Sequence, residues 1–236
     1  MIRFRPLIGP TLWLLPGLAL LVGLGVWQIQ RLGEKEALIA SVEAGMKAPP
    51  VPLSQALPQG AAAEYHHVRL TGHFEHDKEL YLFSRGPMGA VGVDVIAPFV
   101  QDGAQTVLVD RGFVPESLRD PKTRKAGQVV GDVTLTGVLR LTQKPGLFTP
   151  APNHQTRLWF VKDVPDMATA LGVTAPPVLI EADATPNPGG WPLGGQTQVD
   201  FPNDHLQYAV TWFGLALALL AVYLLYHRSR DRLSFG

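Results

Sequence analysis

Two long apolar runs without charged residues constrain this chain of 236 residues more than any other feature. Residues 6–30 form the first run between Arg5 and Arg31, and residues 206–226 form the second, just before His227. Each can cross a hydrocarbon layer of roughly 30 Å as a helix of about 20 residues. Since backbone polar groups in lipid must be satisfied within the protein, isolated spans have to be helices. The sequence therefore predicts two transmembrane helices.

The charges that flank the spans indicate their orientation. Arg3 and Arg5 precede the first run, and Arg228, Arg230 and Arg232 follow the second. Positively charged flanks stay in the cytoplasm. We therefore expect both termini inside and the intervening chain outside, in a bacterial plasma membrane, because no Arg- and Ser-rich transit peptide precedes the first run.

A cleaved signal peptide is the alternative for the first run. That run exceeds the 7–15 apolar residues typical of such peptides, and no cleavage site of the A-x-A type follows it. We expect an uncleaved anchor. The domains predicted are a first transmembrane helix with a short cytoplasmic start (1–31), an extracytoplasmic domain (32–204), a second helix (205–227) and a basic cytoplasmic tail (228–236).

The region between the spans has the pattern of a β-rich domain. Residues 34–46 continue the first helix or form a short helix of their own, and the proline-rich stretch from Lys47 to Gly60 breaks it. Alternating, β-branched runs then predict strands at 65–75, 79–86, 91–100, 105–115, 129–141, 157–163 and 176–184. The Asp102-Gly103 pair predicts a hairpin turn, and residues 164–172 a helix capped by Asp163 and Gly172. Short connections favour an antiparallel sheet, curled or closed into a barrel, in an α+β domain.

Composition excludes several classes of protein. Lys and Arg number 20 against 20 Asp and Glu, so nothing indicates nucleic-acid binding. The chain contains no cysteine, which excludes disulfides, thiolate metal sites and covalent haem attachment. No catalytic motif such as G-x-S-x-G or H-E-x-x-H is present, so we expect no enzyme. His66, His67, His73 and His76 are too widely spaced on a strand to favour a metal site.

The outer ends of the two spans carry the candidate binding residues. His205, Tyr208 and Trp212 share one face of the second helix, at spacings i, i+3 and i+7. Because the two spans run antiparallel, these residues should lie at the same depth in the membrane as the outer end of the first helix.

On that end of the first helix, Trp27 and Arg31 are four residues apart and Gln28 is adjacent. An imidazole, amides, flat rings and a cation suit a haem, with His205 as axial ligand to the iron and Arg31 meeting a propionate. The alternative is ordinary: Trp and Tyr anchor span ends, and Asn203 or Asp204 caps the helix.

Several segments in the same order resemble the Surfeit locus protein 1 family, almost from end to end. They are "GVWQIQRLGEKEALI", "YHHVRLTGHF", "VLVDRGFVP", "GVLRL", "FTPAPNHQTRLWFVKDVPDMATALG" and "NDHLQYAVTWFGLA". The chain departs from the family pattern at four positions. Glu34 replaces Trp, Asp110 and Phe113 replace Asn and Trp, and Asp204 replaces Asn next to His205, where its carboxylate could hold the imidazole.

The resemblance implies a non-enzymatic assembly factor for haem-copper cytochrome c oxidase, which would assist delivery of haem a to subunit I. The expected partners are subunit I, the haem a synthesis machinery and the lipid bilayer. The histidine matching His205 is the family's proposed haem contact. The alternative is a membrane-anchored scaffold that docks oxidase subunits without binding haem.

Overall fold

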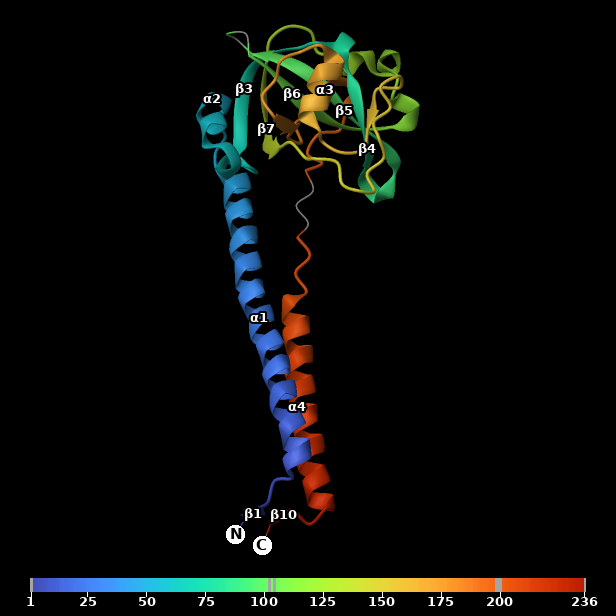
Figure 1. The fold of residues 1–236 in the computed structure, drawn as a ribbon. Helices are drawn as coiled ribbons and strands as arrows, with labels where there is room; N and C mark the ends of the chain where they lie inside the picture. The colour runs from blue at the N-terminus through green and yellow to red at the C-terminus, as the bar shows by residue number, and fades with distance from the viewer. Residues whose placement is uncertain (1, 102, 104, 198–200, 236) are drawn as a thin grey trace. The chain divides into compact units, whose positions relative to one another are not determined.

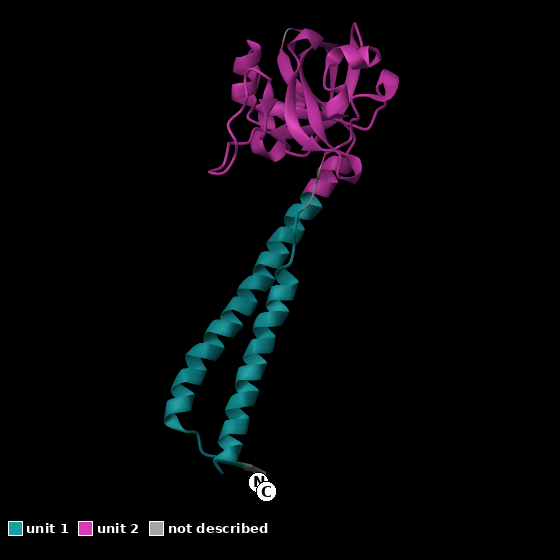
Figure 2. Cartoon of the chain, turned by 90° about the vertical axis from the view of Figure 1, so that its right-hand side faces the viewer, with its two compact units in different colours: residues 1–41, 200–236 teal, residues 42–199 magenta. Residues whose placement is uncertain are grey.

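The computed structural model describes residues 2–101, 103, 105–197 and 201–235 (Figure 1). The chain forms two compact units, residues 1–41 with 200–236 and residues 42–199 (Figure 2). The predicted boundaries after residues 31 and 204 refer to depth in a membrane, so they stay a prediction.

The first unit holds most of the long helix α1 (Ile8–Lys47) and all of the long helix α4 (His205–Ser229). Both are long and apolar enough to cross a membrane, as predicted. α1 continues without a break past Arg31, so residues 34–46 extend the first helix rather than forming another. Its 40 residues span about 60 Å at 1.5 Å per residue, roughly twice a hydrocarbon layer.

The two helices pack antiparallel. Thr11 of α1 lies with its hydroxyl 2.7 Å from that of Tyr223, whereas Gly25 lies under the ring of Phe213. A Cβ at Gly25 would stand 2.7 Å from that ring, so the close approach requires glycine. The chain ends pair as two short antiparallel strands, β1 (Ile2–Phe4) and β10 (Leu233–Phe235).

The second unit is the β-rich domain predicted between the spans. Its strands and helices are β2 (Val51–Pro52), α2 (Leu53–Ala56), β3 (His67–Phe74), β4 (Leu80–Arg85), β5 (Val91–Gln101), β6 (Thr106–Pro115), β7 (Val133–Leu141), β8 (Leu158–Trp159), α3 (Val164–Leu171) and β9 (Val178–Ala182). Its 3₁₀ turns are η1 (Leu57–Ala63), η2 (His76–Lys78), η3 (Pro87–Gly89), η4 (Glu116–Leu118), η5 (Pro121–Gly127) and η6 (Pro188–Gly190). Every predicted strand overlaps an observed one, while β2 and α2 occupy the stretch predicted as a simple break. Two residues of the predicted hairpin turn, Asp102 and Ala104, lie outside the described residues.

The sheet closes into a barrel. Its order is β3-β7-β9-β6-β5, and β3 pairs again with β5 to complete the circle; β2 lies beside β3, and β4 and β8 extend past β5. Most pairs are antiparallel, as predicted, but β2 runs parallel to β3, β8 to β4 and, within the barrel, β9 to β6. The β9–β6 pairing arises because the chain reaches β9 through β7, β8 and α3 rather than through a hairpin from β6.

A buried apolar cluster fills the barrel, and α2 and η1 close one end of it. Leu53, Ala56 and Ala63 of those two elements pack against strand residues of the interior. Along β6, Val107 and Val109 point into this cluster, and the alternation of a strand puts Arg111 on the same face. Leu108 points to the opposite face, and Asp110 shares that face.

α3 covers the outer face of the barrel wall (Figure 1). Its Val164, Met167 and Ala168 pack with Leu108 and Leu179. The predicted caps are confirmed: the Asp163 carboxylate accepts a hydrogen bond of 3.3 Å from the Asp166 backbone N–H, and Gly172 adopts the left-handed conformation, with φ 65°.

Candidate functional site

The first candidate site lies on the helix pair, where the structure brings together two of the predicted residues. The Nδ1 of His205 lies 2.7 Å from the Oε1 of Gln28. The amide oxygen can only accept, so His205 donates through Nδ1–H. The neutral ring then carries its lone pair on Nε2, for which no hydrogen bond is found among the described residues.

This arrangement is typical of a histidine prepared to bind a metal. Metal-ligating histidines usually donate their second ring N–H to an oxygen acceptor, which fixes the tautomer and the ring orientation. The acceptor here is Gln28. The sequence had suggested Asp204 as the group that could hold the imidazole, and the structure corrects this assignment of the partner.

Asp204 does not cap α4 with its side chain, although the alternative to a haem site expected Asn203 or Asp204 to cap this helix. It occupies the N-cap position with φ −92° and ψ 8° and makes no side-chain capping bond. A capping side chain requires extended backbone at this position, which Asp204 lacks.

Arg31, predicted to meet a propionate, pairs with its own helix. Its Nη1 lies 2.6 Å from the Glu34 carboxylate, and both side chains are more than half exposed. Glu34 is one of the positions at which the chain departs from the family pattern. An exposed pair of this kind contributes at most about 1 kcal/mol, so Arg31 can leave it for another anion. The predicted contact between Arg31 and a haem propionate therefore stays a prediction.

The three predicted aromatic residues are placed differently from one another. Trp27 and Tyr208 are about half exposed, as lipid anchors would be. The Trp212 ring is partly buried, and its Nε1 is a buried donor without a hydrogen-bond partner in the described chain. Asn203 Oδ1 is a second buried atom without a partner there. Unsatisfied buried polar atoms are rare, and one explanation is a missing ligand.

The barrel domain contains a buried ion cluster that the sequence did not predict. Arg124 donates two hydrogen bonds to Glu79, of 3.1 and 2.5 Å, and Arg111 lies 3.7 Å from the same carboxylate. Burial raises the pKa of Glu79, but contacts from His76 and Arg124 and the charge of Arg111 outweigh it, and the net pKa is lowered. Burial lowers the pKa of Arg111 to about 10, so it stays a cation at neutral pH.

A second buried cluster lies on the outer side of the barrel wall. Lys162 and Arg140 both pair with Glu181, and Asp94 and Asp110 line a small cavity beside that group. Burial, helped by Glu181, raises the pKa of Asp94 to about 6 despite opposing contacts from Ser84 and Lys162.

Burial also raises the pKa of Asp110 well above its usual range, as do the charges of Asp94 and Glu181. The Asp110 carboxylate accepts a hydrogen bond of 2.9 Å from the Gly112 N–H.

Strand alternation was the only signal that could have revealed these clusters. Charged residues within runs that otherwise read as buried strands, such as the Asp110-Arg111 pair in "VLVDRGFVP", indicate buried charge. The histidines considered for a metal site make other contacts: His73 lies 3.5 Å from Asp132, and His76 lies 2.9 Å from the Val129 carbonyl. Over the part of the chain that is described, no three His, Asp or Glu side chains gather as metal ligands.

Comparison with known proteins agrees with the resemblance seen in the sequence. The model of the SURF1 family matches residues 16–217. Surfeit locus protein 1 of Rattus norvegicus is 40% identical over 211 residues, which is 83% of this chain and 68% of that protein. The Homo sapiens protein of that name is 40% identical over 212 residues, 83% of this chain and 70% of that protein.

A third relative shows a similar degree of identity. A SURF1-like protein of Monosiga brevicollis is 40% identical over 219 residues, covering 87% of this chain and 83% of that protein. The family-model match, residues 16–217, includes more than half of each span and the whole barrel domain. This chain belongs to the SURF1 family.

Proposed function

We propose that this protein assists the assembly of a haem-copper cytochrome c oxidase by holding haem a at the α1–α4 pair for delivery to subunit I. Family membership supports a role in cytochrome c oxidase assembly. The haem step rests on one observation, the hydrogen bond from His205 Nδ1 to Gln28.

The residues of the helix pair fit a haem. When bound, haem a would supply an iron that accepts an axial nitrogen ligand. His205 would hold it through Nε2, with Gln28 keeping the ring in the required tautomer. Trp212 Nε1 has no hydrogen-bond partner in the described chain and could donate to an anionic haem edge, and Arg31 could leave the exposed Glu34 for the same purpose.

The proposed setting is a bacterial plasma membrane with both termini in the cytoplasm and the barrel domain outside. The arginines that flank the two spans support this orientation. In this role the protein acts by binding and transfer rather than by catalysis. Subunit I and the haem a synthesis machinery are the proposed partners.

One observation favours the scaffold alternative. Leu147 and Phe148 are adjacent, apolar and each 92% exposed. Exposed apolar side chains that lie together often mark a protein–protein contact. A docking role would need this loop and would not need His205.

The test compares full-length variants produced in cells that make haem a. We expect the wild-type protein to purify with Soret absorbance, and His205→Ala to lose it. Gln28→Leu removes the acceptor that orients the imidazole, and we expect haem affinity to fall by about 10–100-fold. Oxidase activity of a strain lacking the wild-type protein should be restored by the wild-type gene and poorly by either variant.

His227→Ala is the matched control, since it removes the other histidine of α4. Both ring nitrogens of His227 are engaged, Nε2 by the Leu7 N–H and Nδ1 by the Tyr223 carbonyl, so it offers no free lone pair. Haem recovery equal to wild type in His205→Ala would refute the ligand role. If Leu147→Ser/Phe148→Ser abolished oxidase assembly while His205→Ala did not, the scaffold function would be favoured.

A further inference from the structure

The open end of the barrel contains a cavity that the oxidase-assembly role does not use. Its volume is about 190 Å³, and it lies where β3 and β9 end and β7 begins. The opposite end is filled by α2 and η1. Mouths of β-barrels are common sites for small ligands. Thr134, Thr185 and Pro186 on its rim are exposed, so the cavity can be reached from solvent.

One side of the cavity carries an excess positive charge. Arg111 lines it and is only 2% exposed. The Glu79 carboxylate is already held by the two hydrogen bonds from Arg124, so two guanidinium groups share one carboxylate. His76 and Tyr81 are titratable groups beside them, and neither adds a negative charge at neutral pH, since burial raises the pKa of Tyr81 above its ordinary value. A buried charge that is not compensated is costly, and an anion in the cavity would relieve that cost.

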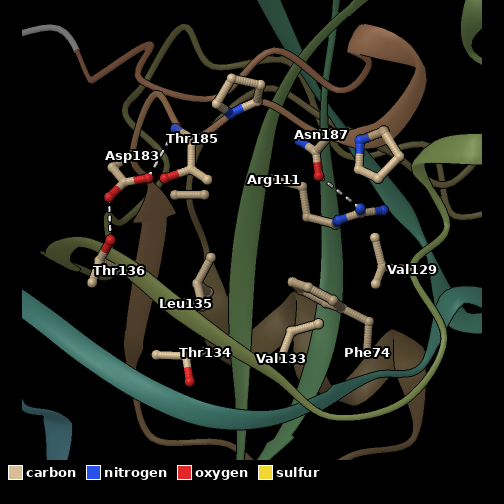
Figure 3. Close-up of a pocket in the computed structure, with 13 residues that line it drawn as sticks. Phe74, Arg111, Val129, Val133, Thr134, Leu135, Thr136, Asp183, Thr185 and Asn187 are labelled. Atoms are coloured by element: carbon tan, nitrogen blue, oxygen red, sulfur yellow. Dashed lines mark hydrogen bonds between the residues drawn. The ribbon is translucent and has the colours of Figure 1, made fainter.

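The Arg111 guanidinium is held in position but not saturated. It donates to the Gly127 carbonyl at 2.5 Å, and its Cζ lies 4.7 Å from the Phe74 ring centroid. Its contact with the Asn187 side-chain oxygen is 3.4 Å, which is long for a hydrogen bond (Figure 3). A carboxylate could replace this weak contact and would form a stronger, charge-assisted one.

The rest of the cavity selects for an apolar body and against a second negative charge. Phe74, Val133 and Leu135 form an apolar side below Arg111 in Figure 3. Asp183 lies at the side away from Arg111, where it accepts hydrogen bonds from the Thr136 hydroxyl and the Thr185 N–H. Those contacts lower its pKa although burial raises it, so Asp183 is an anion at neutral pH. A cavity of about 150 Å³ holds one benzene molecule, which sets the scale of the ligand.

We propose that the barrel mouth binds a small apolar monocarboxylate, with its carboxylate on Arg111 and its apolar body against Phe74, Val133 and Leu135. The site is distinct from the helix pair, and its occupation does not depend on haem.

The experiment measures binding of 4-fluorobenzoate to the detergent-solubilised full chain by ¹⁹F NMR. 4-Fluorobenzyl alcohol is the uncharged probe, terephthalate competes as the dianion, and protein-free micelles correct for partitioning. Arg111→Met removes the charge but leaves the Glu79–Arg124 pair balanced, and Val133→Phe fills the cavity. Arg69→Gln, an exposed arginine on β3, is the matched control.

For the wild-type protein and Arg69→Gln we expect a Kd of about 1 mM, because a ligand with so few atoms can form only a few contacts. Arg111→Met should weaken 4-fluorobenzoate binding by about tenfold or more, to the level of the alcohol. Val133→Phe should abolish it, and terephthalate should compete poorly unless Asp183 is changed to Asn.

Two results would overturn the proposal. One is no binding of 4-fluorobenzoate to the wild-type protein up to about 10 mM. The other is equal binding to wild type, Arg111→Met and Val133→Phe. If Arg111→Met failed to fold, two measurements would still test the proposal. They are the preference of the wild-type protein for 4-fluorobenzoate over the alcohol and the loss of 4-fluorobenzoate binding in Val133→Phe.

Discussion

The buried carboxyl of Asp94 should make the barrel domain less stable as the pH rises. Burial raises its pKa from the ordinary 3.8 to about 6, so the folded state favours the protonated form. Between these two pH values the folded protein binds more protons than the unfolded chain, and stability therefore falls as pH increases. A carboxyl with these two pKa values loses roughly 3 kcal/mol of folding free energy across that window.

Asp94→Asn removes this ionisation and keeps the shape of the side chain. We expect the variant to be more stable than wild type by up to about 3 kcal/mol at about pH 7.5, and nearly equal to it at about pH 4. Urea denaturation of the detergent-solubilised protein, followed by tryptophan fluorescence across this range, measures the difference. Asp77→Asn, at an exposed position, is the control and should not alter the pH profile.

A variant less stable than wild type at neutral pH would refute this reasoning. It would mean that the Asp94 carboxylate stabilises the fold as a partner of Lys162 more than its burial costs.

Three further substitutions test other parts of the barrel domain, each by urea denaturation. Arg124→Met removes the two hydrogen bonds to Glu79 and leaves Arg111, 3.7 Å away, as its remaining cationic partner; the variant should be less stable by about 1.5–3 kcal/mol, and full stability would contradict the ion cluster. Gly112→Ala should destabilise by about 2 kcal/mol or more, since φ is 109° and a Cβ would lie 2.1 Å from the Leu193 carbonyl oxygen; an unchanged midpoint would argue against that contact. Trp159→Phe loses the 2.7 Å hydrogen bond from its Nε1 to Asp166 in the first turn of α3 and should cost about 1–3 kcal/mol; a variant as stable as wild type would contradict this bond.

The spans, the strands and the one helix capped by Asp163 and Gly172 were predictable because their signals are local. Lengths of uncharged sequence specify membrane-crossing helices, alternation specifies strands, and single residues specify helix ends. The approach of His205 to Gln28 was also predictable, since two antiparallel apolar runs of similar length place residues of equal membrane depth side by side.

The identity of each contact was not predictable. Asp110 could be read as a conservative replacement in a strand, but only the barrel shows that it is buried with Asp94 and Glu181. Gln28, rather than the adjacent Asp204, holds the imidazole of His205.

The sequence by itself determined the two membrane-crossing helices, the β-rich domain between them and the family. The tertiary structure decided that β9 runs parallel to β6, that β3 closes the barrel against β5, and that Arg111 faces a cavity whereas Asp110 faces the opposite side. The physical reason is range: helix and strand patterns depend on neighbours within a few residues, whereas barrel closure and buried charge depend on segments brought together from far apart in the chain.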